Sequence, residues 1–295
     1  MSDHPVEIDV AAWVEKARAD PITYKQRQAV EITLNAIADT TPLNEKLYLK
    51  GGILMGLAYG SPRQTADIDL TAAFDPEGDI DEKIESLLNA AFPRTAAKLG
   101  YTDLILKIHS IKKQPKKIFE QADAPALKMK VAFATRGTSE EAALKEGKVP
   151  GLIEVDIYFN EVLRHFQLLE LTGGPELRAY SLSELIAEKY RSMLQQKERN
   201  RNRRQDTYDL DRLLAEHTPN DAIKAEILAT FVDKCRSRNI KPTREALDDQ
   251  EIRTRSSKDW DTLSLELGTL PDFEPCYDRV NAFYKTLPWP GPAAP

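Results

Sequence analysis

The sequence predicts an α+β protein, with a β-sheet in the first part of the chain and helices alone in the second. Segments in which apolar and polar residues alternate, the pattern of half-buried strands, all end by Asn160. Beyond the glycine pair Gly173-Gly174 the apolar residues follow a helical period instead. We therefore expect one domain over residues 1–172 and a helical domain over residues 173–295.

The composition narrows the class of protein. The chain has 295 residues, of which 41% are hydrophobic and 30% charged, with a net charge of -6. This length supports one or two domains with a substantial core. No apolar run approaches the ~20 residues of a membrane span, and the N-terminus lacks the features of a secretory signal. Two cysteines, Cys235 and Cys276, are too few for a disulfide framework, so we expect a cytoplasmic protein without membrane contact.

Apolar periodicity and breaker residues give the individual elements. A helix over residues 80–91 is expected to be interrupted at Pro93, because proline lacks a backbone N–H, and to close near Gly100. The other helices are expected at residues 24–39, from about Ser181, 206–215, 220–236, 243–252 and 273–286. The strands are expected at residues 66–70, 104–111, 126–135 and 152–160.

The stretch YLKGGILMGLAYGSPRQTADIDL, residues 48–70, is the most informative part of the chain. Gly51 and Gly52 stand between a strand-like run and a short apolar helix, where backbone N–H groups can approach a phosphate. Asp67 and Asp69 share one face of the following strand. Neighbouring carboxylates resist ionisation, and a magnesium ion, which takes oxygen ligands, offsets that repulsion. An exposed edge strand can carry such a pair without function, but together with the glycines it indicates phosphoryl or nucleotidyl transfer.

This stretch resembles the first motif of the DNA polymerase β-type nucleotidyltransferase superfamily and, more closely, the AbiEii/AbiGii-type toxin nucleotidyltransferases. The shared pattern is Lys-Gly-Gly, then Gly-Ser, then Asp-x-Asp. In those proteins the third residue after the lysine is often Thr or Ser, whereas here it is Ile53, which leaves only backbone N–H groups at that point. The resemblance implies that phosphates are bound by Gly51, Gly52 and Ser61, with Lys50 or Arg63 neutralising charge in the transition state.

The resemblance also implies a third carboxylate on a neighbouring strand, which completes a two-metal site. In the strand LIEVDIYFN, Glu154 and Asp156 lie on one face, and the spacing does not decide between them. We prefer Asp156, so the expected magnesium ligands are Asp67, Asp69 and Asp156. The alternative is an ordinary half-exposed strand face.

A second group of residues lies between Tyr180 and Leu214. It resembles an AbiEii-like pattern of an acidic residue, four intervening residues and a lysine, matched by Glu184 and Lys189. The resemblance implies that Lys189 contacts the nucleotide phosphates. The alternative is a surface helix with ordinary ion pairs.

The family's next segment, Arg-Asp-x-x-Asp, is matched by Asp206 and Asp209, which are three residues apart and share a helix face. The family arginine is replaced by Gln205, with Arg204 one place earlier. The resemblance implies that Asp206 positions Lys189 or takes part in the acceptor step.

Basic residues gather in two places, KKQPKK at residues 112–117 and the segment from Lys197 to Arg204. The first is either a solvated hairpin turn or a patch for an RNA backbone.

From these features we predict an NTP-dependent nucleotidyltransferase that moves an NMP to an acceptor hydroxyl with Mg²⁺. The resemblance implies a mixed sheet that holds the metals, a helical lobe, the tRNA 3′ end as acceptor, and a toxin paired with an antitoxin. The alternatives are a protein or small-molecule acceptor, or a degenerate nucleotide or RNA sensor without turnover.

Overall fold

The computed structural model describes residues 5–63 and 65–290. They form two compact units that we describe separately. The first contains residues 5–60, 65–161 and 166–179, and the second contains residues 61–63, 162–165 and 180–290.

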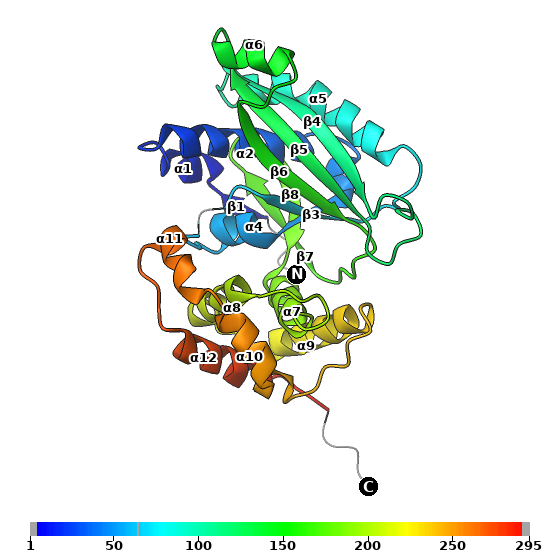
Figure 1. Cartoon of the computed structure of the whole chain (residues 1–295), viewed down its shortest axis with the longest axis vertical. Coiled ribbons are helices and arrows are strands. Elements are labelled where there is room, and N and C mark those ends of the chain that lie inside the picture. Colours follow the sequence, from blue (N-terminus) through cyan, green and yellow to red (C-terminus); the bar gives the residue numbers. More distant parts are fainter. Residues whose placement is uncertain (1–4, 64, 291–295) are drawn as a thin grey trace. The chain divides into compact units, whose positions relative to one another are not determined.

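In the described part of the chain, the first unit is built on an eight-stranded mixed sheet with the order β1-β7-β8-β2-β3-β6-β5-β4 (Figure 1). β3 pairs antiparallel with β2 and parallel with β6, and β5 pairs antiparallel with both β6 and β4. The strands are β1 (Val6–Ile8), β2 (Leu47–Lys50), β3 (Ile68–Ala72), β4 (Leu104–Gln114), β5 (Ala126–Thr135), β6 (Gly151–Tyr158), β7 (Phe166–Leu171) and β8 (Glu176–Tyr180).

One face of this sheet is apolar and covered by two helices. Helix α5 (Ile80–Lys98) packs on β4, and α2 (Pro21–Ala38) packs on β6 and on α5 (Figure 1). Leu70, Val155 and Met129 point to this covered face and are at most 1% exposed. The opposite face carries the polar residues that alternate with these apolar ones along the strands, and it contains the candidate site. The other helices of the unit are α1 (Val10–Glu15), α3 (Leu43–Lys46), α4 (Gly51–Ala58) and α6 (Ser139–Lys145).

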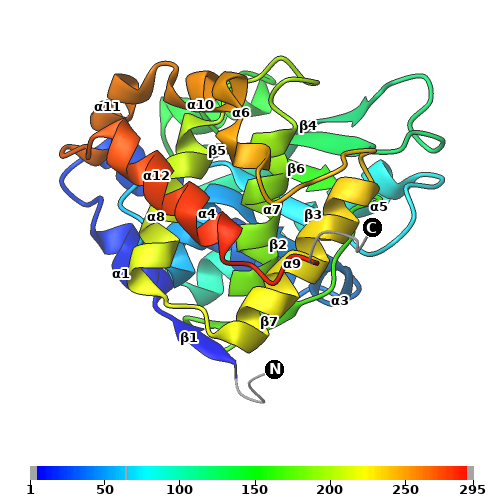
Figure 2. The same ribbon diagram turned by 90° about the horizontal axis from the view of Figure 1, so that it is seen from below.

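The second unit is helical in its described part. Helix α7 packs against α8 and α9, and α12 packs against α8 (Figure 2). Tyr190, Phe231 and Tyr284 form its aromatic core and are all fully buried. The elements are α7 (Leu182–Leu194), α8 (Arg204–Glu216), α9 (Asp221–Arg236), η1 (Ala246–Asp248), α10 (Gln250–Ser257), η2 (Trp260–Leu263), α11 (Ser264–Leu267) and α12 (Phe273–Lys285).

Two sequence expectations about these elements were wrong. Helix α5 is not interrupted at Pro93 but runs unbroken to Lys98, close to the end expected near Gly100, because Pro93 is exposed while Leu88 and Phe92 bury the helix against the sheet. The structure also contains strand β8 beyond residue 172, where we expected helices alone. Gly173 and Gly174, both with φ of +94°, turn the chain from β7 into β8.

Candidate functional site

The turn from β2 into α4 is shaped by its two glycines. Gly51 has a φ of +75°, and a Cβ at this residue would lie 2.2 Å from Oδ2 of Asp69. A Cβ at Gly52 would lie 2.8 Å from the Thr65 side chain. The N-cap residue, Lys50, makes no side-chain capping hydrogen bond to the first turn of α4. The backbone therefore comes close to a carboxylate while the first-turn N–H groups have no side-chain cap, an arrangement suited to binding a phosphate.

Four charged residues lie directly opposite one another across four neighbouring strands. Lys50 on β2 pairs with Asp69 on β3, Asp69 pairs with Asp156 on β6, and Asp156 pairs with Lys128 on β5. Directly paired residues point to the same face of a sheet. We call this set, Lys50, Asp69, Asp156 and Lys128, the charged row. It places two carboxylates side by side between two lysines.

The outer members of the charged row are held by further contacts. Lys128 Nζ donates to Asp156 Oδ2, and the hydroxyl of Tyr158 donates to the same oxygen at 3.1 Å. The Tyr158 ring lies 4.2 Å from Lys50 Nζ and 4.8 Å from Lys128 Nζ. Lys50 also donates to Glu161, which accepts the hydroxyl of Thr71 at 2.5 Å. Both lysines are therefore fixed next to the carboxylates.

The two lysines do not fully offset the negative charge of the carboxylates. Burial raises the pKa of Asp69 to about 6; Lys50 opposes this rise, and the Asp156 carboxylate adds to it. Asp67, an exposed residue just before β3, also has a raised pKa, through partial desolvation of its carboxylate and then through repulsion by Glu154 and Asp156. A cation among these groups would favour their ionised forms.

Glu154 and Asp156 have different surroundings in the structure. Asp156 lies directly opposite Asp69, whereas Glu154 is exposed and pairs with Lys130 at 3.3 Å. In residues 5–63 and 65–290, no three His, Cys, Asp or Glu side chains are gathered closely enough to hold a metal ion. The donors available are oxygen atoms only, which is the chemistry that Mg²⁺ prefers.

In the second unit, Lys189 on α7 meets both aspartates of α8. Its Nζ lies 2.6 Å from Asp209 Oδ2 and 3.3 Å from Asp206 Oδ1. Arg63 Nη1 donates to Asp209 Oδ2 at 2.8 Å. We call Lys189, Asp206, Asp209 and Arg63 the Lys189 cluster. Burial lowers the pKa of Lys189, but Asp209 and Asp206 more than offset this, so its pKa is raised and the side chain stays charged.

The residues expected to bind nucleotide divide between the two units. Lys50, Gly51 and Gly52 belong to the first. Ser61 and Arg63 belong to the second, where buried Ser61 accepts the backbone N–H of Arg63 at 3.4 Å. Arg63 Nε also donates to Glu266 at 3.2 Å.

Glu184 has a structural setting. It is fully buried, and its Oε2 accepts the backbone N–H groups of Arg164 at 3.1 Å and His165 at 3.0 Å. Its Oε1 lies 2.7 Å from Nζ of buried Lys234, which also donates to the carbonyl of Val162. Glu184 therefore anchors the short segment 162–165 within the second unit.

Our reading of the sequence did not select several residues of the site. Lys128 and Tyr158 contact Asp156, and Thr71 and Glu161 form the network around Lys50. The alternation of the strand at 126–135 could have indicated Lys128, but its partner depends on strand pairing, which one sequence does not reveal.

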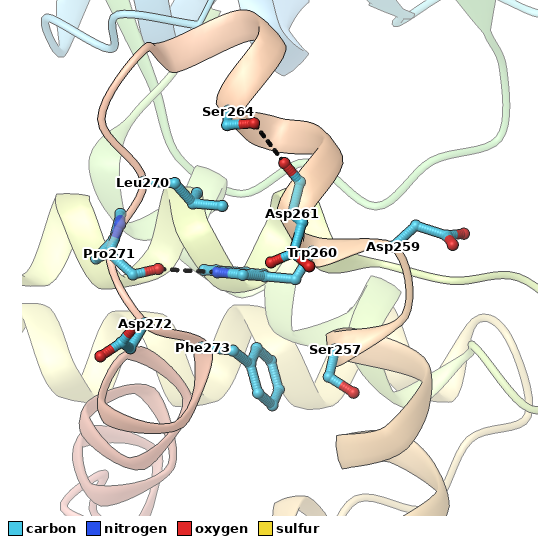
Figure 3. Close-up of a pocket in the computed structure, with 9 residues that line it drawn as sticks. All are labelled: Ser257, Asp259, Trp260, Asp261, Ser264, Leu270, Pro271, Asp272 and Phe273. Atoms are coloured by element: carbon cyan, nitrogen blue, oxygen red, sulfur yellow. Dashed lines mark hydrogen bonds between the residues drawn. The ribbon is translucent and has the colours of Figure 1, made fainter.

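A separate pocket of about 620 Å³ lies within the second unit (Figure 3). Its wall includes the indole of Trp260, whose Nε1 donates to the Pro271 carbonyl at 2.9 Å, and three aspartates, Asp259, Asp261 and Asp272. None of the predicted site residues lines it.

The motifs and most of the helical second unit fall within one family match. The chain matches the family described as nucleotidyl transferase AbiEii toxin, type IV toxin–antitoxin system, over residues 33–280. The chain belongs to the AbiEii family. It is therefore an NTP-dependent nucleotidyltransferase and a toxin of the type IV class, which confirms the family and enzyme class predicted from the sequence.

The fold agrees with this membership. The nucleotidyltransferase toxin MenT4 from Mycobacterium tuberculosis H37Rv aligns with 94% of this chain and 99% of its own, with a TM-score of 0.50 and 12% sequence identity. At this identity the likeness concerns the fold, and it confirms the α+β prediction. No curated protein matches the chain significantly. Within the described residues, no helix combines the length and apolar character needed to span a bilayer.

Proposed function

We propose that this AbiEii family enzyme transfers an NMP from an NTP to a hydroxyl of RNA, specifically the 3′ end of tRNA, in the cytoplasm. In this reaction the acceptor oxygen bonds to the α-phosphorus, the bond to the β-phosphate oxygen breaks, and pyrophosphate leaves. A cognate antitoxin is the expected protein partner. The observation that carries the proposal is the contact of the Gly51 backbone with Asp69, because it puts an uncapped helix start beside paired carboxylates.

The first unit supplies groups for the nucleotide. The first-turn N–H groups of α4, at Gly51 and Gly52, would bind phosphate oxygens, and Lys50 adds positive charge next to them. Asp67, Asp69 and Asp156 would hold Mg²⁺, which when bound supplies stabilisation of the negative charge that develops on the phosphates. The raised pKa values of Asp67 and Asp69 support this assignment, since such carboxylates favour a nearby cation.

The residues around Asp156 orient that carboxylate. Lys128 and Tyr158 both donate to its Oδ2, which leaves Oδ1 as the oxygen without a donor from these two side chains. A fixed carboxylate costs little reorganisation during the reaction, which is the basis of electrostatic preorganisation.

We assign Lys189 to the triphosphate and Asp206 to the acceptor step or to the position of Lys189. Lys189 keeps its charge despite burial, and an ammonium suits a phosphate as a point charge. Oδ2 of Asp206 is buried, lies 3.7 Å from Arg203 Nε and accepts no hydrogen bond within the described chain. It can therefore accept a hydrogen bond from a hydroxyl of the acceptor. Arg63, which shares Asp209 with Lys189, is assigned to charge neutralisation in the same step, and Ser61 to phosphate binding.

The test is incubation of the protein with each of the four α-³²P-labelled NTPs, Mg²⁺ and total tRNA. Asp69→Asn and, as a matched control, Asp75→Asn are run in parallel; Asp75 is exposed and follows the same strand. We expect label on tRNA with the wild type and with Asp75→Asn but not with Asp69→Asn. Label on protein or on small acceptors in place of RNA would refute tRNA as the acceptor.

A further inference from the structure

The polar face of the sheet continues beyond the charged row to the edge strand β4. Lys112 on β4 lies directly opposite Lys128 on β5, so it stands on the same face and in line with Asp156 and Asp69. Ser110 lies opposite Lys130 in the adjacent row. The line of paired residues therefore runs from two carboxylates to two lysines.

Lysine is frequent in the sequence of β4, β5 and their connection, although Lys113, Lys128 and Lys130 are paired with carboxylates. Residues 107–130 contain seven lysines and two acidic residues, in a chain whose net charge is -6. Lys112, Lys116 and Lys117 are exposed, and in the described chain none of the three has a carboxylate partner. We call these three residues the hairpin lysines, since they belong to the β4–β5 connection and the strand end that enters it.

Protection of an edge strand does not explain this arrangement. Lysines on an edge strand discourage pairing with other chains, but Lys116 and Lys117 lie beyond the end of edge strand β4, in its connection to β5. Moreover, two lysines placed directly opposite one another, as Lys112 and Lys128 are, repel and destabilise a sheet. Local conflicts of this kind are expected where a surface binds an anion.

We propose that the hairpin lysines bind the phosphate backbone of the acceptor RNA and guide its reacting end along the sheet to the carboxylates. This inference rests on the proposed function and adds the place where the acceptor binds. From Asp69 to Lys112 there are three strand steps, roughly 14 Å at about 4.8 Å each. At about 3.4 Å per phosphate, the spacing along one strand of a stacked duplex, this distance corresponds to at most about four nucleotides, since an unstacked strand is more extended. The lysines therefore contact phosphates upstream of the reacting hydroxyl, not the terminal nucleotide.

The test compares two triple variants, each in the inactive Asp69→Asn background so that binding is measured apart from turnover. The first is Lys112→Gln/Lys116→Gln/Lys117→Gln. The control, Lys98→Gln/Lys145→Gln/Lys148→Gln, removes the same charge from exposed lysines that precede β4 or follow β5 in sequence and that are each paired with a carboxylate. Binding of tRNA is followed by fluorescence anisotropy between about 50 and 300 mM salt.

Three lost phosphate contacts should lower the salt slope of log K by about 2, since each contact to a single strand contributes about 0.7. At 0.1 M salt this corresponds to roughly 100-fold weaker binding for the hairpin variant and little change for the control. Equal binding by the two variants, or no tRNA binding by the parent, would overturn the inference. A double variant limited to the turn, Lys116→Gln/Lys117→Gln, leaves β4 unchanged and should bind tRNA roughly 25-fold more weakly than the parent.

A second readout separates this inference from the proposed function. In the active background, the hairpin variant should have a raised KM for tRNA but an unchanged rate on a dinucleotide acceptor, which is too short to reach the lysines. If the wild type labels tRNA and both variants do so equally well, the proposed function stands and the hairpin assignment fails. If the hairpin variant alone loses tRNA binding while no protein labels RNA, the surface is confirmed and the acceptor proposal fails.

Discussion

Replacement of Gly51 by alanine tests the geometry of the site most directly. A Cβ at this residue would lie 2.2 Å from Asp69 Oδ2, so the carboxylate or the turn must move by about 1 Å to reach an ordinary contact distance. A misplacement of this size in a catalytic group lowers activity about 100-fold. The φ of +75° adds backbone strain of about 1–2 kcal/mol, because residues with a side chain disfavour this conformation.

Gly100→Ala separates the two effects. Gly100 has a φ of +82°, and a Cβ there would have nothing within 4 Å, so this variant carries the strain without the collision. Urea unfolding should show a loss of about 1–2 kcal/mol for Gly100→Ala and a larger loss for Gly51→Ala, which adds the collision. Label transfer from α-³²P-NTP should fall about 100-fold in kcat/KM for Gly51→Ala alone. If Gly51→Ala stays within tenfold of Gly100→Ala, the contact between Gly51 and Asp69 is not part of the active site.

Three further changes have defined outcomes. The pKa of Asp69 is about 6 in the folded protein against an ordinary 3.8, so the wild type loses stability as the pH rises through that range. In urea unfolding with a chelator present, Asp69→Asn should therefore be more stable than the wild type by up to about 3 kcal/mol at pH 8. This difference should shrink toward pH 4. Lys189→Met removes the ammonium shared by Asp206 and buried Asp209 and leaves Arg63 paired with Asp209, so it should lower the free energy of unfolding by about 3 kcal/mol. Replacement of exposed Lys258 by methionine should change it by less than about 0.5 kcal/mol. Gly151→Ala would place a Cβ 2.3 Å from the Phe133 ring, so we expect a loss of about 1–3 kcal/mol in thermal unfolding with normal nucleotidyl transfer by the folded fraction.

Local patterns in the sequence were sufficient to locate most of the strands that form the site. The alternation in residues 126–135 and 152–160 gave β5 and most of β6, and Gly51-Gly52 marked the start of α4. The strand β3 was shifted, since it covers Ile68–Ala72 and leaves Asp67 just before it. What local patterns could not give is the register between strands, which decides that Asp156 and not Glu154 lies opposite Asp69.

The failures have the same origin in tertiary structure. Pro93 interrupts the hydrogen bonding of a helix, but burial of its neighbours on the sheet outweighs that loss. The Lys189 cluster depends on Arg63, which is far from Asp209 in sequence and joins it only through folding. Long-range ion pairs of this kind leave no periodic signal.

The membership of Arg63 in the second unit has a consequence for synthesis on the ribosome. When residue 179 has emerged, every residue of the charged row is available, but the two carboxylates that pair with Arg63, Asp209 and Glu266, have not yet left the ribosome. A chain that terminates early would therefore carry the complete carboxylate motif together with an unpaired arginine beside it in sequence. Completion of the Lys189 cluster requires late-made residues, so an interrupted translation product is not a smaller version of the toxin.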